Sequence, residues 1–193
     1  MIVLVLGGVA SGKSAYAERI ALELTGRRRP LYIATADRKL SWADPEMMRR
    51  IERHRERRGR QWELIEVTST KGGTDLTGAL KRAGAERRVA LVDCLTLWLG
   101  NLMHESRNVA NQQARLIAAL ERATAPVVLV SDEVGLGGIA DNPLARAFAD
   151  AQGALNQAVA RVATRVVFVA AGLPLVLKDI SSDDTSSKDR THP

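Results

Sequence analysis

The clearest candidate for chemistry is an eight-residue run near the N-terminus, Gly7-Gly8-Val9-Ala10-Ser11-Gly12-Lys13-Ser14. It matches every fixed position of the pattern G-x-x-x-x-G-K-[ST], and it lies between an apolar run and a helical pattern. In such a loop, backbone amides surround phosphate oxygens, the lysine reaches the β- and γ-phosphates, and the hydroxyl binds Mg²⁺. The sequence therefore predicts a phosphate-binding loop (P-loop) with Lys13 as a catalytic residue and Ser14 as a metal ligand.

Two later segments carry carboxylates after apolar runs. Asp93 follows the run Val89–Val92. Alone, such a residue is usually a helix cap or a turn residue, but beside a P-loop we expect it to hold Mg²⁺ or its waters. The segment Ser131–Gly138 combines two carboxylates with three glycines. It is either a ligand-binding loop at the carboxyl end of a strand or an ordinary turn, and both interpretations stay open.

His54 is a candidate nucleophile on a predicted basic helix, Pro45–Arg58. It lies three residues after Ile51, which places it on the apolar stripe of that helix. Arg50 and Arg58 lie four residues to either side, and their charges would lower the pKa of the imidazole and keep it neutral. From spacing alone, a structural histidine on a solvated basic helix remains the alternative.

Composition restricts the class of protein. The 193 residues fit one domain, and 46% apolar with 26% charged residues is typical of a globular protein. We expect no membrane span and no export, because the chain has neither a long apolar run nor a signal-type segment. Cys94 is the one cysteine, so no internal disulfide forms and a cytoplasmic location is favoured. Its place after an apolar run predicts a buried structural thiol.

The net charge of +6 is unevenly distributed. Residues 1–60 hold 14 Lys and Arg against 7 Asp and Glu, whereas residues 61–193 hold 14 against 15. Such a basic N-terminal segment suits a small polyphosphate as well as a nucleic acid. Aromatic residues make up only 4% of the chain, which argues against a surface for base stacking. We therefore expect small-molecule substrates and no nucleic acid, with a nucleic-acid-binding NTPase as an alternative.

The elements that must position these residues alternate between short apolar runs and helical patterns. Strands are predicted at Ile2–Leu6, Leu31–Ala34, Leu64–Val67, Val89–Val92, Val127–Val130 and Val166–Ala170, and helices at Lys13–Leu24, Pro45–Arg58, Asp75–Ala83, Asn111–Ala123 and Pro143–Ala163. This order predicts an α/β fold whose mostly parallel central sheet has helices on both faces. The segment Glu63–Val67 is predicted to be peripheral, because charged residues alternate with apolar ones there. Residues 1–178 form one domain, and the polar segment 179–193 is predicted to be a disordered tail.

Seven segments occur in the order found in one known family. They are Gly7–Ser14, Tyr32–Ala36, Arg50–Arg55, Val92–Leu99, Glu133–Gly135, Asn142–Arg146 and Ala171–Pro174. Over residues 1–178 the chain resembles the bifunctional adenosylcobinamide kinase/adenosylcobinamide-phosphate guanylyltransferases of cobalamin synthesis. The basic segment with its single histidine is more specific to that family than the P-loop.

The resemblance implies a fold and a reaction. The family fold is a RecA-like P-loop NTPase fold with an antiparallel edge strand, which would be Leu173–Leu177 here. The family phosphorylates adenosylcobinamide with a nucleoside triphosphate, ATP or GTP, and then transfers GMP from GTP to the new phosphate through a histidine, matched here by His54. Some members are trimers, so a homo-oligomer is expected. A P-loop kinase of another small molecule, with no guanylyltransferase activity, is the alternative.

The resemblance also assigns nucleotide contacts to particular residues. Besides Gly7, Gly8, Val9, Ala10, Ser11, Gly12, Lys13 and Ser14, it assigns Ala34, Thr35 and Ala36, the basic segment Arg55, Glu56, Arg57 and Arg58, and finally Glu66 and Asp93. Members of that family mostly have asparagine where this chain has Asp132. An added carboxylate near a phosphate site weakens anion binding unless a metal ion or an arginine compensates its charge. No general base for the kinase step is evident from the sequence.

Overall fold

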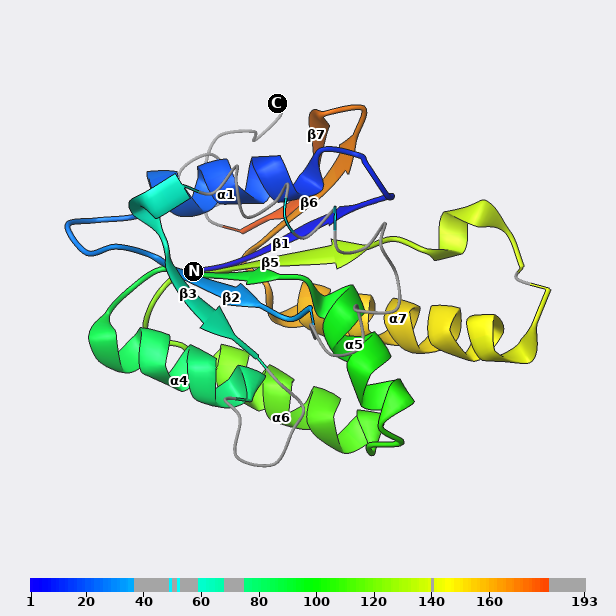
Figure 1. Ribbon diagram of the computed structural model, residues 1–193. Helices are drawn as coiled ribbons and strands as arrows, with labels where there is room; N and C mark the ends of the chain where they lie inside the picture. The colour runs from blue at the N-terminus through cyan, green and yellow to red at the C-terminus, as the bar shows by residue number, and fades with distance from the viewer. Residues whose placement is uncertain (37–48, 50–51, 53–58, 68–74, 140, 181–193) are drawn as a thin grey trace, which may run out of the picture.

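The chain forms one seven-stranded sheet in the order β3-β2-β4-β5-β1-β6-β7 (Figure 1). The computed structural model describes residues 1–36, 49, 52, 59–67, 75–139 and 141–180. The strands are β1 (Ile2–Gly7), β2 (Leu31–Ala34), β3 (Glu63–Glu66), β4 (Ala90–Asp93), β5 (Val127–Asp132), β6 (Arg165–Ala170) and β7 (Leu173–Asp179). All neighbouring strands pair in parallel except β6 and β7, which are antiparallel. The predicted mostly parallel sheet with an antiparallel edge strand is confirmed.

Helices cover both faces of the sheet, as the sequence predicts. The helices are α1 (Lys13–Glu23), α4 (Leu76–Glu86), α5 (Leu95–His104), α6 (Val109–Glu121) and α7 (Pro143–Val162), with short 3-10 turns η1 (Gly59–Gln61) and η2 (Gly135–Gly137). On one face, α1 packs Tyr16, Ala17 and Ala21 against the sheet. On the other face lie α4, α5, α6 and α7 (Figure 1), and their side chains contribute the larger apolar core. The central strands are buried on both sides, which explains their nearly unbroken apolar sequences.

Local signals account for most element boundaries. The side chains of Asp75, Asn108 and Asn142 accept hydrogen bonds from backbone amides in the first turns of α4, α6 and α7. Pro143 occupies the first turn of α7, where a missing N–H costs nothing. The predicted helices at these three places therefore begin within two residues of the observed ones.

Two elements differ from the sequence predictions. The helix α5 was not predicted: Leu95–Leu99 continues an apolar run, and Cys94 makes no side-chain cap. The strand β7 extends to Asp179, which pairs with Arg165, so the strand includes the first residue of the predicted tail. The peripheral strand is confirmed, because β3 lies at one edge of the sheet. The predicted helix Pro45–Arg58 falls almost entirely outside the described residues.

Candidate active site at the phosphate-binding loop

The P-loop connects β1 to α1 and depends on two of its glycines. A Cβ atom on Gly7 would lie 2.5 Å from both the Ser11 Oγ and the Val169 carbonyl oxygen, so no larger residue fits there. Gly12 has φ of 92°, a left-handed conformation that favours glycine, and it precedes the first turn of α1. The chain therefore turns sharply between strand and helix, and it presents the free amides of α1 at the carboxyl edge of the sheet.

The P-loop lysine is held by two acceptors within the protein. The Lys13 Nζ lies 2.5 Å from the Asp132 Oδ1 and donates a hydrogen bond of 3.0 Å to the Gly8 carbonyl oxygen. The two side chains of the ion pair are only 11% and 17% exposed. Gly7 and Asp132 are register partners at the carboxyl ends of β1 and β5. The parallel register therefore brings this carboxylate to the P-loop.

Ser14 and Asp93, the two predicted metal ligands, are in contact. The Ser14 Oγ lies 3.4 Å from the Asp93 Oδ1, and the buried Tyr32 hydroxyl donates a hydrogen bond to the Asp93 Oδ2. A hydroxyl and a carboxylate are hard oxygen donors of the kind Mg²⁺ prefers. Within the described part of the chain, no cluster of three or more Asp, Glu, His or Cys could hold a metal unaided. The donors present therefore fit a cation that is shared with nucleotide phosphates and water.

Other predicted nucleotide contacts lie along the same edge of the sheet. Ala34 at the end of β2 pairs in register with Glu66 on one side and Asp93 on the other. The Thr35 Oγ1 accepts a hydrogen bond of 2.8 Å from the Cys94 amide and donates one of 2.6 Å to the Cys94 carbonyl oxygen. The fully buried Thr35 side chain thus joins the ends of β2 and β4. Nucleotide contacts from Ala34, Thr35, Ala36 and Glu66 stay predictions.

Cys94 has the buried position that the sequence predicts. Burial, followed by the charges of Asp93 and Asp132, raises the pKa of its thiol to about 12. The thiol therefore remains protonated at neutral pH and is a poor nucleophile.

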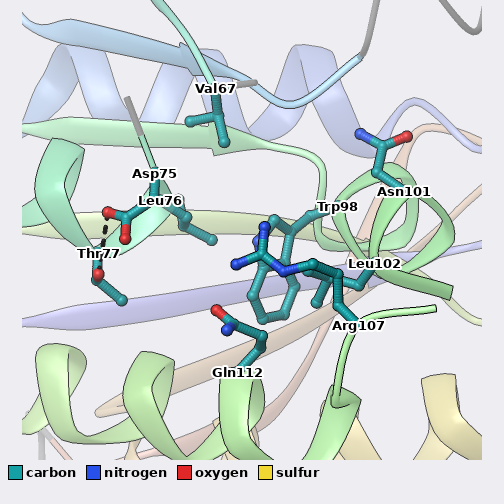
Figure 2. A pocket seen from close by; sticks show the side chains of 9 residues that line it. All are labelled: Val67, Asp75, Leu76, Thr77, Trp98, Asn101, Leu102, Arg107 and Gln112. Atoms are coloured by element: carbon teal, nitrogen blue, oxygen red, sulfur yellow. Dashed lines mark hydrogen bonds between the residues drawn. The ribbon is translucent and has the colours of Figure 1, made fainter. Parts of the chain in front are cut away.

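Trp98 is a core residue and is 6% exposed. It borders a cavity of about 30 Å³ between α4, α5 and α6, where Asp75, Thr77 and Gln112 supply polar groups (Figure 2). Such a cavity has room for one or two waters and no nucleotide. A larger cavity of about 710 Å³ lies between α5, η2 and α7, with Met103, Val134, Leu144 and Phe148 among its lining residues. Its lining includes no basic side chain other than His104.

The structure brings the P-loop and Asp93 together at one edge of the sheet. His54, Arg55, Glu56, Arg57 and Arg58 lie outside the described residues. Sequence reasoning assigned no role to Tyr32, whose contact with Asp93 depends on the pairing of β2 with β4. The sequence singled out Asp132 as an added carboxylate but did not indicate that Lys13 is its partner. The sequence also gives no sign that the turn after β6 contacts the P-loop, where the Gly172 amide donates a hydrogen bond of 2.8 Å to the Ser11 carbonyl oxygen.

Comparison with solved structures agrees on the fold. One match is an ATPase domain with a TM-score of 0.52 and 11% sequence identity, covering 93% of this chain and 77% of that one. Another is a protein from Pyrococcus horikoshii OT3 with a TM-score of 0.54 and 12% identity, covering 93% and 86%. At such low identity these matches establish a P-loop ATPase-type fold and nothing further. No helix among the described residues is long and apolar enough to cross a membrane.

Comparison of sequences identifies the family. The chain is 40% identical to the bifunctional adenosylcobalamin biosynthesis protein CobP of Pseudomonas aeruginosa, over 91% of this chain and 96% of that protein. It is 34% identical to the protein CobU of Escherichia coli K12, described by the same words, over 92% of this chain and 100% of the relative. Residues 3–177 match the family model described as cobinamide kinase / cobinamide phosphate guanyltransferase. The chain, with its intact P-loop and its Ser14–Asp93 contact, belongs to this family of transferases.

Proposed function

We propose that this enzyme phosphorylates the hydroxyl of adenosylcobinamide with a nucleoside triphosphate and then transfers GMP from GTP to adenosylcobinamide phosphate. The observation that carries the proposal is the P-loop with Lys13, Ser14 and Asp93 at one edge of the sheet, in a chain whose full-length relatives are named for cobalamin synthesis. Two chemically different transfers from a triphosphate can share this loop, because both require the same phosphates to be held in place.

For the kinase step, the protein contributes mainly position and charge. Backbone amides of the loop and the Lys13 ammonium hold the β- and γ-phosphates. The hydroxyl oxygen of the acceptor forms a bond to the γ-phosphorus while the bond from that phosphorus to the β,γ-bridging oxygen breaks. A Mg²⁺ ion bound near Ser14 and Asp93 would offset negative charge on the phosphates. The proton of the acceptor hydroxyl goes to solvent or to a base that we do not identify.

For the guanylyl transfer, we propose His54 as the nucleophile. A neutral imidazole nitrogen attacks the α-phosphorus of GTP, and the bond to the α,β-bridging oxygen breaks so that pyrophosphate leaves. A phosphate oxygen of the acceptor then attacks the same phosphorus and releases the imidazole. The support for this step is the basic sequence around His54, its match to the family pattern, and the net positive charge of residues 1–60, which suits a polyphosphate.

Labelling tests the covalent step directly. Incubation with GTP labelled at the α-phosphate should give protein-bound label that is acid-labile and alkali-stable, and GTP labelled at the γ-phosphate should give none. His54→Ala should lose the label and keep the kinase reaction. His192→Ala, a substitution in the predicted tail, is the matched control and should keep both. Turnover of GTP to adenosylcobinamide-GDP with no labelled intermediate would reject His54 and favour direct transfer.

Two further expectations belong to this proposal. A homo-oligomer, with a trimer as the first candidate, is expected from the family resemblance, and sedimentation equilibrium measures it. The cytoplasm is the expected location, because the chain has one cysteine, and its thiol is buried.

A further inference from the structure

The ion pair between Lys13 and Asp132 uses the ammonium group that a triphosphate requires. The Lys13 Nζ lies 2.5 Å from the Asp132 Oδ1 and 3.0 Å from the Gly8 carbonyl oxygen to which it donates. Both side chains of the pair are more than four-fifths buried. Any ligand that binds the Lys13 ammonium must therefore separate it from the Asp132 carboxylate, whose charge water screens poorly.

The backbone of Asp132 is held in place by hydrogen bonds to neighbouring side chains. Its amide donates a hydrogen bond of 2.8 Å to the Thr96 Oγ1, and its carbonyl oxygen accepts one of 3.0 Å from the Asn156 Nδ2. Behind it, the buried Gln152 Nε2 donates to both the Ser131 Oγ and the Asn156 Oδ1. Register pairing with Gly7 completes the set. The carboxylate can rotate about its own side-chain bonds, but its Cα stays beside the P-loop.

This arrangement has a consequence for anion binding. When phosphate oxygens take Lys13, the Asp132 carboxylate is left without its cation and close to several negative charges. Asp93 is a second carboxylate at the same edge, in contact with Ser14. Two carboxylates and a triphosphate in a partly buried site repel one another unless another cation is present.

We propose that Asp132 couples triphosphate binding to Mg²⁺. The Asp132 carboxylate holds Lys13 when no nucleotide is bound. Once the Lys13 ammonium moves to the phosphates, the Asp132 carboxylate needs a divalent cation nearby. Ser14 and Asp93 supply the oxygen donors for that cation, and Asp132 adds charge that makes the metal-free triphosphate a poor ligand. This inference rests on the proposed function only in requiring that the P-loop binds a nucleoside triphosphate. It assigns Asp132 a positioning role toward Lys13 and no part in bond breaking.

Titration calorimetry with GTP tests the coupling, with excess Mg²⁺ in one series and with EDTA in the other. The quantity of interest is the ratio of the two dissociation constants. Asp132→Asn keeps the shape and an acceptor for Lys13 but removes the charge, so it should bind metal-free GTP roughly tenfold more tightly than the wild type. With Mg²⁺ the two proteins should differ less than about threefold. The ratio of the dissociation constant in EDTA to that in Mg²⁺ should therefore be closer to one in Asp132→Asn than in the wild type.

Control variants distinguish the loss of the Asp132 charge from a general change in net charge and from a loss of folding. Asp150→Asn removes one negative charge from an exposed position on α7 and should leave the ratio unchanged. Asp132→Ser, which also lacks the charge, should lower the ratio of the two dissociation constants as Asp132→Asn does. Circular dichroism checks that each variant is folded. An Asp132→Asn protein that binds metal-free GTP no better than the wild type overturns the inference. Wild-type protein that binds no GTP even with Mg²⁺ overturns the proposed function instead.

Discussion

The backbone amide of Gly172 donates a hydrogen bond of 2.8 Å to the carbonyl oxygen of Ser11. The tight turn between β6 and β7 thereby supports the middle of the P-loop. The Gly172 Cα lies 3.1 Å from where a Cβ on Gly12 would stand, so the two segments are closely packed. The antiparallel edge hairpin thus packs directly on the P-loop.

This contact predicts a stability effect at Gly172, whose φ of 77° is left-handed. Gly172→Ala should lower the free energy of unfolding by about 1–2 kcal/mol, because a Cβ disfavours this conformation. It should also weaken GTP binding, since the turn supports the loop. Gly153→Ala, inside α7 with nothing within 4 Å of the new Cβ, should instead raise stability by about 0.5–1 kcal/mol. Urea unfolding measures both, and equal effects at the two glycines would contradict this account.

The first two glycines of the P-loop should respond differently to the same substitution. Gly7→Ala places a Cβ 2.5 Å from the Val169 carbonyl oxygen and should cost about 1–3 kcal/mol or more of stability. A Cβ on Gly8 meets nothing within 4 Å, so Gly8→Ala should change stability by less than about 0.5 kcal/mol. Thermal unfolding of the two variants compares them without nucleotide. A Gly8→Ala protein as unstable as Gly7→Ala would show that the loop is packed more tightly than described.

Asp93 should matter more for catalysis than the tyrosine that positions it. Asp93→Asn removes the charge beside Ser14 and should lower kcat of the kinase step roughly 100-fold, equivalent to about 2.7 kcal/mol. Tyr32→Phe removes one hydrogen bond to that carboxylate and should cost about tenfold or less. Kinase rates measured across Mg²⁺ concentrations distinguish the two variants. If Asp93→Asn keeps wild-type kcat at saturating Mg²⁺, the predicted metal role is wrong.

The buried thiol predicts a pH dependence of stability. The pKa of Cys94 rises from the ordinary 9.0 to about 12 on folding, so between these pH values the unfolded chain loses a proton that the folded chain keeps. Stability from this group is complete below pH 9 and falls as pH rises toward 12. The urea midpoint should therefore decrease less between pH 8 and pH 10 in Cys94→Ser than in the wild type. Equal falls would contradict the raised pKa.

The same thiol offers a simple reactivity test. Cys94 is the one cysteine of the chain, so labelling by a thiol reagent has no background from other residues. At pH 8 the native protein should react roughly 100-fold more slowly than the urea-unfolded protein. Rapid native labelling would show that the segment after β4 opens readily.

Much of the site could be predicted because its residues are adjacent in sequence. The P-loop pattern spans eight residues, and its chemistry follows from their backbone and side chains. Asp93 could be predicted because a parallel strand that ends beside a P-loop commonly carries a metal-binding carboxylate. The helix α5 could not, since its apolar sequence has neither the alternation of a strand nor a polar helix face.

By itself, the sequence predicted the P-loop, most of the strands and helices in their order along the chain, and the family. Local patterns encode these features, because a glycine turn, an apolar strand or a helix cap depends on residues close in sequence. Only the tertiary structure decided that Asp132 holds Lys13, that Tyr32 holds Asp93 and that Gly172 supports Ser11. These pairs join residues far apart in the chain, and the register of β1 with β5, of β2 with β4 and of β1 with β6 creates them. Strand order and register come from packing the whole sheet, which no short segment specifies.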